Sequence, residues 1–296
     1  MPISLLIDCD PGLDDAVAIA LAAASPSIDL EALTTVHGNA PIDMVTTNAL
    51  SVCEALGLDL PVYRGAERAL KVEPRTSAML WGGDGSLKLP APKQRAAGDA
   101  VDYLARMLAA AEPCSKTVCP VGPLTNIARL VERAPAALKE IERLVVMGGA
   151  LGAGNATPHA ELNIWVDPHA AARVFAADIP LTLVPLDLTR RVVAKPSHIE
   201  ALRSSSVATA RLCARLLPMA GEESHPSSIH DACAVGYLLW PELFHIDEGE
   251  LSVVTRGAEE GRTRFRREAG GRHHVAVGLS VDTFLDRLVA TLASGS

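Results

Sequence analysis

The chain has 296 residues, 49% of them hydrophobic and 21% charged, and its formal net charge is -8, so it is long enough to bury a large core. The acidic balance excludes a typical nucleic-acid-binding protein, because such a protein needs a surface of Lys and Arg that neutralises phosphate. No basic signal-peptide start and no run of ~18 apolar residues is present, so we expect a cytoplasmic protein without a membrane partner.

Apolar runs alternate with helical patterns along the first two thirds of the chain. The predicted strands are Ile3–Ile7, Leu30–Val36, Lys116–Pro120, Leu144–Met147 and Leu181–Leu186. The predicted helices are Asp14–Ala24, Ile42–Leu56, Ala100–Ala111, Leu124–Arg133 and Pro168–Ala177. Short apolar strands separated by helices are typical of a parallel sheet that is covered on both faces.

After about residue 196 the pattern is mostly helical. Short strands are predicted in GELSVVTRG, RTRFRRE and HHVAVGLS, before a last helix at Val281–Ala293. We find no internal repeat and no linker, so we predict one α/β domain over residues 1–296. Its sheet should be mostly parallel and doubly wound, with helices on both faces and a helical C-terminal portion. Six scattered cysteines without a Cys-x-x-Cys pair indicate reduced thiols.

Four carboxylates follow the first predicted strand, in the segment DCDPGLDD. They are Asp8, Asp10, Asp14 and Asp15, and Pro11-Gly12 supplies a turn between them. A helix dipole favours one or two acids at this place, which is the plainer explanation, but several acids in one turn repel each other unless a cation binds. Hard oxygen ligands indicate Ca²⁺ or Mg²⁺. We expect Asp10 to face the surface of this turn rather than the core.

Two further segments carry candidate site residues. His230-Asp231 stands directly before an apolar helical run, where an acid also suits the start of a helix. The loop GNATPHAELNIWV holds Asn155, Glu161 and Asn163, whose amides and carboxylate suit sugar hydroxyls, although an ordinary polar loop has the same composition. The acidic segment and the segments HGNA, GPLTN, MGGA and PLDLT each follow a predicted strand, so they should lie together at the carboxyl ends of the strands, where open α/β sheets bind ligands. The long loops at residues 65–98 and 148–166 are of a kind that is usually functional or disordered.

The sequence resembles the inosine-uridine nucleoside hydrolase family over nearly its whole length. The matching segments are, in chain order, DCDPGLDDAVAI, TTVHGN, GPLTNIA, VVMGGA, GNATPHAELNIWVDPHAA and IHDACAVGYLL. The resemblance implies a bound Ca²⁺ and the hydrolysis of ribonucleosides to ribose and free base. It also implies a homodimer or homotetramer, by analogy alone.

The resemblance implies a role for each matching residue. The side chains of Asp10, Asp15 and Asp231 and the backbone carbonyl of Val121 would hold calcium. The residues that would hold the ribose and its 5′ end are Asp14, Asn39, Asn155, Glu161 and Asn163, with Met147 beneath the sugar. Asp10 would also act as general base toward water, and His230 would help the base leave.

The sequence departs from the family pattern in the loop after the third strand. Trp81 stands where a His-Gly pair is common, and its indole could stack on a base and favour purines, or it could simply pack the loop. Ala232 follows Asp231 where Pro is common, which changes the helix start but no ligand. His225, in the segment GEESHPSS, could reach the base, and no role is assigned to His37.

Two other functions remain open at this point. A phosphatase of the haloacid dehalogenase type also has Asp-x-Asp after its first strand, but it fits the second acid pair and the Asn-Glu-Asn loop poorly. A non-catalytic nucleoside- or ribose-binding protein could keep the same calcium site, although the presence of both Asp10 and His230 argues against it.

Overall fold

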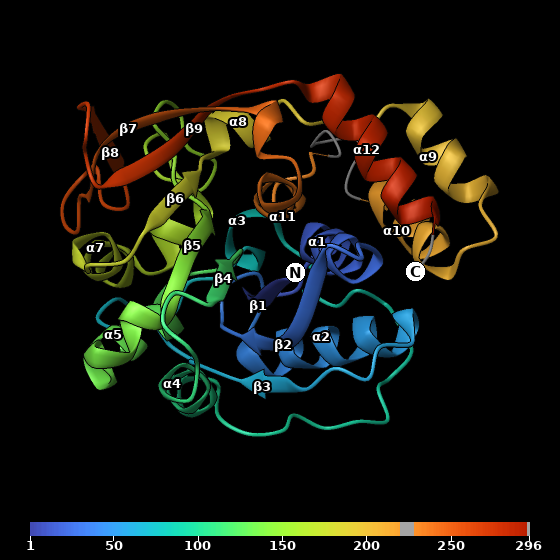
Figure 1. Ribbon diagram of the computed structural model, residues 1–296, viewed down its shortest axis with the longest axis horizontal. Coiled ribbons are helices and arrows are strands. Elements are labelled where there is room, and N and C mark those ends of the chain that lie inside the picture. The colour runs from blue at the N-terminus through green and yellow to red at the C-terminus, as the bar shows by residue number, and fades with distance from the viewer. Residues whose placement is uncertain (220–227, 295–296) are drawn as a thin grey trace.

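A single twisted sheet runs through the protein, with strands from both ends of the chain (Figure 1). The computed structural model describes residues 1–219 and 228–294, and within them nine strands form the order β3-β2-β1-β4-β5-β6-β9-β7-β8. Their bounds are β1 Ile3–Cys9, β2 Ile28–Thr35, β3 Val62–Arg64, β4 Lys116–Pro120, β5 Ile141–Met147, β6 Leu181–Val184, β7 Phe244–Val253, β8 Thr263–Arg267 and β9 His273–Leu279.

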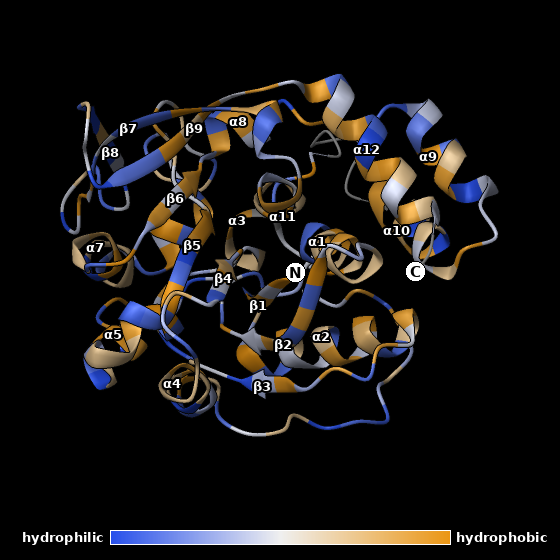
Figure 2. Cartoon of the chain, in the orientation of Figure 1, coloured by the Kyte–Doolittle hydropathy of each residue, from blue (hydrophilic) through white to orange (hydrophobic). Residues whose placement is uncertain are grey.

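The sheet is parallel from β3 through β6 to β9, and β7 runs antiparallel to both β9 and β8. The hairpin of β7 and β8 is largely hydrophilic (Figure 2), and β8 carries arginines at residues 264, 266 and 267. Each of these arginines pairs with a nearby carboxylate. Charged side chains of this kind protect an edge strand from pairing with another chain.

Helices cover both faces of the sheet (Figure 1). One face carries α1 Leu13–Ala24, α2 Ile42–Leu56, α10 Ala208–Met219, α11 Ala232–Leu239 and α12 Val281–Ser294, with α9 Pro196–Ser204 packed outside on α10 and α12. The other face carries α4 Ala100–Ala109, α5 Thr125–Arg133 and α7 Pro168–Ala176. Three short helices lie in connections, at α3 Ala78–Trp81, α6 Leu162–Val166 and α8 Leu186–Thr189, with 3₁₀ turns at η1 Pro135–Glu140 and η2 Pro241–Leu243.

Side chains of the parallel strands alternate between two cores. Along β1, Leu5 and Ile7 belong to the core beneath α1 and α11, whereas Leu6 belongs to the core beneath α4 and α5. Along β5, Val145 and Val146 divide in the same way. Because successive side chains of a strand point to opposite faces, a strand buried on both faces must be apolar at every position, which explains the continuous apolar runs.

The fold class predicted from the sequence is confirmed. The predicted helix Ile42–Leu56 and the predicted strand Lys116–Pro120 match the structure residue for residue, and the other predicted helices differ by one or two residues at their ends. The strand Val62–Arg64 was not predicted. In the described residues no helix is long and apolar enough to cross a membrane, and the six cysteines are free thiols.

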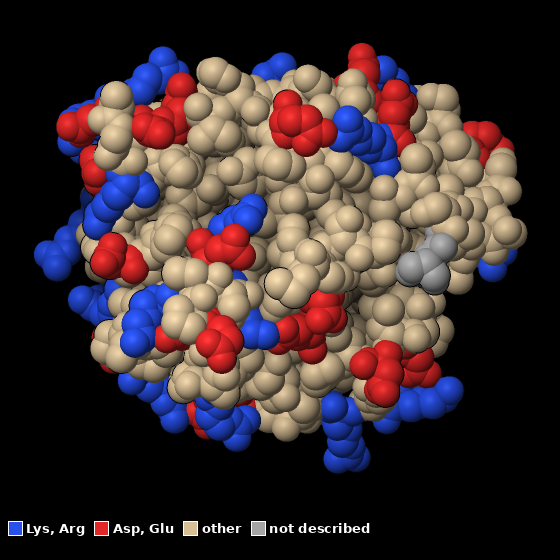
Figure 3. All heavy atoms as spheres, in the orientation of Figure 1, with Lys and Arg blue, Asp and Glu red and all other residues tan. Residues whose placement is uncertain are grey.

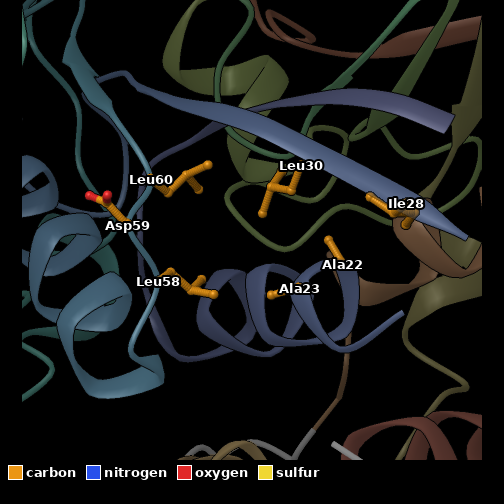
Figure 4. Close-up of a pocket in the computed structure, with 7 residues that line it drawn as sticks. All are labelled: Ala22, Ala23, Ile28, Leu30, Leu58, Asp59 and Leu60. Carbon is orange, nitrogen blue, oxygen red and sulfur yellow. The ribbon is translucent and has the colours of Figure 1, made fainter. Parts of the chain in front are cut away.

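Acidic and basic side chains are interspersed on the face shown in Figure 3, without a broad patch of either sign. A small hollow of about 210 Å³ lies at the amino ends of the strands, between the end of α1 and the start of β2. Its wall is apolar except for Asp59 (Figure 4). A larger cavity lies at the opposite edge of the sheet.

Candidate functional site

The larger cavity, of about 710 Å³, opens at the carboxyl ends of the strands. The predicted site residues that line it are Asp14, Asn39, Val121, Met147, Asn155, Glu161, Asn163, His230 and Asp231. Asp10 and Asp15 are buried directly beside this wall, as their hydrogen bonds to its backbone show. Segments distant in sequence therefore meet at the sheet edge where ligands of open α/β folds bind.

Two predicted residues are not placed by the structure. The backbone of Trp81 ends α3 at the rim of the cavity, where Gly82 and Gly83 belong to the lining, but its side chain lies outside the described part of the protein. His225 also lies outside the described residues. His37 is buried with Nδ1 at 3.3 Å from the carbonyl oxygen of Ala66, and it is not among the residues that line the cavity.

The acidic turn is held by its own backbone. Asp15 Oδ1 accepts a hydrogen bond from the Asp10 amide at 3.1 Å, and Asp15 Oδ2 accepts one from the Gly12 amide at 2.9 Å. Asn39 ties the turn to the loop after β2, because its Nδ2 donates to the Asp10 carbonyl oxygen at 3.0 Å and to Asp15 Oδ2 at 3.4 Å. The turn is thus fixed before any ligand binds.

Asp10 lies in the interior, with only 1% of its surface exposed. Our expectation of a surface-facing turn carboxylate is wrong, because loops from the neighbouring strands cover it. Oδ2 accepts a hydrogen bond from the Asn39 amide at 2.6 Å, while Oδ1 has no hydrogen-bond partner in the described structure. A buried carboxylate oxygen without a donor is costly unless a cation or water contacts it.

Three carboxylates approach one another closely enough to share a metal ion. Oxygen atoms of Asp14, Asp15 and Asp231 lie within 4.8 Å of one another, and none of these residues forms an ion pair with Lys or Arg in the described structure. Asp231 arrives from the last third of the chain, at the N-terminus of α11. The structure thus adds Asp14 to the predicted metal-binding residues, while the role of Asp10 as a ligand stays a prediction.

The pKa values of this cluster are shifted by burial and by mutual repulsion. Burial, followed by the charge of Asp14, raises the pKa of Asp15 to about 7. Burial and the charges of Asp14 and Asp15 raise the pKa of Asp231 well above its usual range, and burial with the charge of Asp15 does the same for Asp10. Without a cation, burial and repulsion destabilise the ionised forms of these carboxyl groups. A cation that binds oxygen ligands, such as Ca²⁺ or Mg²⁺, therefore fits this set of donors.

The polar loop after β5 forms the opposite wall. Glu161 begins α6, where its carboxylate accepts hydrogen bonds from the amides of Gly149, Asn163 and Ile164 at 2.8, 2.9 and 3.2 Å. Asn163 Nδ2 donates to the Val121 carbonyl oxygen at 2.8 Å. Asn155 Oδ1 accepts from the Leu162 amide at 2.9 Å. These contacts orient the predicted sugar-binding side chains and leave Asn155 Nδ2 and Asn163 Oδ1 for a ligand.

His230 lines the cavity directly beside Asp231, and its ring contacts a residue that the sequence did not single out. Its Nδ1 is 2.8 Å from the hydroxyl oxygen of Thr189. Burial lowers the pKa of His230, and the charge of Arg190 acts in the same direction, while that of Asp14 opposes it. Arg190 also lines the cavity and donates from Nη2 to the Ala153 carbonyl oxygen at 2.7 Å.

Comparison with known proteins decides the family. The profile of the inosine-uridine preferring nucleoside hydrolases matches residues 5–286. The chain belongs to this family. The pyrimidine-specific ribonucleoside hydrolase RihB of Escherichia coli strain K12 is 35% identical over 291 residues, which cover 94% of this chain and 93% of that relative.

Solved structures of nucleoside hydrolases share the fold. A plant nucleoside hydrolase superimposes with a TM-score of 0.91 at 28% identity, over 99% of this chain and 100% of that one. A purine-preferring ribonucleoside hydrolase from Gardnerella vaginalis superimposes with a TM-score of 0.88 at 27% identity, over 98% of each chain. The resemblance drawn from the motifs is confirmed, and this nucleoside hydrolase is an enzyme that acts on N-glycosyl compounds rather than a phosphatase.

A second buried carboxylate supports the site of this nucleoside hydrolase from below. Asp8 Oδ1 accepts hydrogen bonds from Thr34 Oγ1 at 2.6 Å and from Asn126 Nδ2 at 2.7 Å, whereas Oδ2 has no partner in the described structure. Burial raises the pKa of Asp8 to about 7. The Asp8 carbonyl oxygen also accepts a hydrogen bond from the Val121 amide at 2.8 Å. Asp8 therefore joins β1, β2 and the start of α5 directly beneath the acidic turn.

Proposed function

We propose that this enzyme hydrolyses the N-glycosidic bond of ribonucleosides, giving ribose and a free base, with Ca²⁺ as its metal ion. One observation carries the proposal. A buried cluster of acids, the polar side chains of Asn155, Glu161 and Asn163, and His230 lie together in or beside one cavity of about 710 Å³. Membership in the nucleoside hydrolase family supports the same reaction.

Asp10, Asp15, Asp231 and the carbonyl oxygen of Val121 would hold the ion, and the proximity of Asp14 makes it a further candidate. When bound, calcium lowers the pKa of a coordinated water and orients a diol. Carboxylates and a backbone carbonyl are the oxygen ligands that Ca²⁺ prefers.

Side chains of the protein would stabilise the charge that develops on the sugar and would transfer the protons. Cleavage of the glycosidic bond builds positive charge on the sugar, as in other glycosyl transfers, and the surrounding carboxylates of Asp14 and Glu161 favour that charge. Asp10, whose Oδ1 has no protein partner, would take the proton of the attacking water. Asn39, Asn155 and Asn163 would bind the hydroxyl groups above Met147, and His230 would assist the departing base.

The base preference is proposed from Trp81. Stacking on an indole favours the larger face of a purine, so we expect a broad enzyme that prefers purine nucleosides. The relatives differ on this point, since one is named pyrimidine-specific and another purine-preferring. Assembly into a homodimer or homotetramer and a cytoplasmic location are likewise proposed from the family resemblance and the sequence.

Release of free base from inosine, uridine and cytidine tests the reaction. Thorough chelation should abolish it, and Ca²⁺ should restore it. Asp10→Asn should lower kcat by roughly 10²–10⁴-fold, the range for a lost general base. Asp29→Asn, which changes an exposed carboxylate at the start of β2, is the matched control and should retain wild-type turnover. Activity in metal-free protein, or near-normal turnover of Asp10→Asn, would refute the respective part of the proposal.

A further inference from the structure

Thr189 is a fully buried residue whose hydroxyl group contacts His230, a residue that lines the cavity. Its side chain has 0% exposed surface, and its hydroxyl oxygen is 2.8 Å from His230 Nδ1. Thr189 ends α8, directly after β6, whereas His230 stands at the start of α11. The contact therefore fastens the imidazole ring to a separate, rigid element of the fold.

The direction of this hydrogen bond follows from the surroundings of the hydroxyl. In the described structure, His230 Nδ1 is the only side-chain or backbone partner of Thr189 Oγ1. If Nδ1 carried the hydrogen and donated, the hydroxyl hydrogen would be buried without an acceptor, which costs about 1–3 kcal/mol. If the hydroxyl donates, both groups are satisfied. The hydroxyl of Thr189 therefore donates and Nδ1 accepts.

The other ring nitrogen of His230, Nε2, remains available to a ligand in the cavity. His230 lines the cavity, and its Nε2 forms no hydrogen bond with the described residues. A neutral imidazole with an accepting Nδ1 carries its hydrogen on Nε2. A carboxylate or carbonyl partner at Nδ1 would select the opposite tautomer, with a lone pair directed at the cavity, and no such group contacts Nδ1 in the described structure.

We infer that Thr189 is a positioning residue that keeps the neutral ring of His230 as a hydrogen-bond donor toward the nucleobase. The inference rests on the proposed function. The C1′–N bond breaks with its electron pair remaining on the base, and the Nε2–H group donates a hydrogen bond to an oxygen or ring nitrogen on which this negative charge accumulates. The site should therefore favour nucleosides whose base has a hydrogen-bond acceptor atom near the glycosidic nitrogen.

Substrates with different leaving groups test this inference. Thr189→Val keeps the shape of the side chain and removes the hydroxyl, and Thr189→Ser restores it. We expect Thr189→Val to lower kcat for inosine and uridine by about 10–100-fold, the usual effect of removing a residue that orients an active side chain. The loss on 4-nitrophenyl β-D-ribofuranoside should be at most about threefold, because nitrophenolate leaves without a hydrogen-bond donor. Thr189→Ser should recover most of the nucleoside activity.

A spectroscopic measurement distinguishes a role of Thr189 in orienting His230 from a role in packing alone. With ¹⁵N-labelled histidine, the ring shifts of His230 should show hydrogen on Nε2 in the wild type and in Thr189→Ser, and a mixture of tautomers in Thr189→Val. Equal losses of Thr189→Val on all three substrates, no loss on any, or hydrogen on Nδ1 in the wild type would each overturn the inference. A wild-type protein that released no base would refute the proposed function, while the ring shifts would still decide the role of Thr189.

Discussion

Replacing Gly122 by alanine would test whether the position of the Asp10 carboxylate controls activity. A Cβ atom at Gly122 would lie 2.6 Å from Asp10 Oδ1 and 3.0 Å from Val36 Cγ1, whereas ordinary contact begins at 3.4 Å. The carboxylate must therefore move by about 0.8 Å, the difference between 3.4 and 2.6 Å. It cannot simply rotate, because Oδ2 is held by the Asn39 amide and packs directly against Gly38.

A displacement of about 1 Å at a reacting group costs roughly 10²-fold in rate, so kcat of Gly122→Ala for inosine or uridine should fall by about that factor. Calorimetric titration with Ca²⁺ should show weaker binding, and the extra methyl group should cost about 1–3 kcal/mol of unfolding free energy. Gly148→Ala is the matched control, because its nearest neighbours, Glu161 Oε2 and Ile164 Cδ1, lie at 3.4 and 3.5 Å. Wild-type turnover and calcium affinity in Gly122→Ala would refute the reasoning.

Three further predictions concern metal, base and scaffold. In metal-free protein the raised pKa of Asp15, about 7, means that the folded state binds a proton that the unfolded chain releases, so Asp15 should lower the free energy of unfolding by about 2.5 kcal/mol between pH 5 and 7.5. At saturating Ca²⁺ the fall should be smaller by about this amount, whereas the part that comes from Asp8, whose pKa is also about 7, should remain. Trp81→Ala should lower kcat/KM for inosine by roughly 10-fold, with a smaller loss for uridine, as expected for lost stacking; equal losses would remove Trp81 from base recognition. Asn126→Leu should leave the Asp8 carboxylate short of a donor and destabilise the protein by about 1–3 kcal/mol, and an unchanged melting temperature would contradict the supporting role of Asp8.

The strands and helices were largely predictable because burial on both faces imposes a continuous apolar pattern. The exceptions have physical causes. Val62–Arg64 is too short to establish a period. The start of β7 was predicted too late, at Gly249 instead of Phe244, because this antiparallel strand is partly exposed and carries Asp247 and Glu248. A partly exposed strand with charged side chains lacks the continuous apolar run that identified the buried strands.

The candidate site was predictable where its chemistry is local in sequence. Asp10, Asp14 and Asp15 fall in one turn, so their convergence follows from the strand before them. The burial of Asp10 could not be predicted, because it depends on Gly38 and Gly122, which belong to loops after other strands. Thr189 was not identified individually, because a threonine in a short helix is common and its partner is 41 residues away.

The acid cluster joins two segments that lie far apart in the sequence. Asp14 and Asp15 precede Asp231 by roughly 200 residues, and α11 must dock on α1 before the three carboxylates meet. A nascent or truncated chain therefore carries an incomplete, self-repelling turn with little affinity for cations. Tight metal binding becomes possible only once α11 has docked on α1, so metal loading of this enzyme reports that these two segments have folded together.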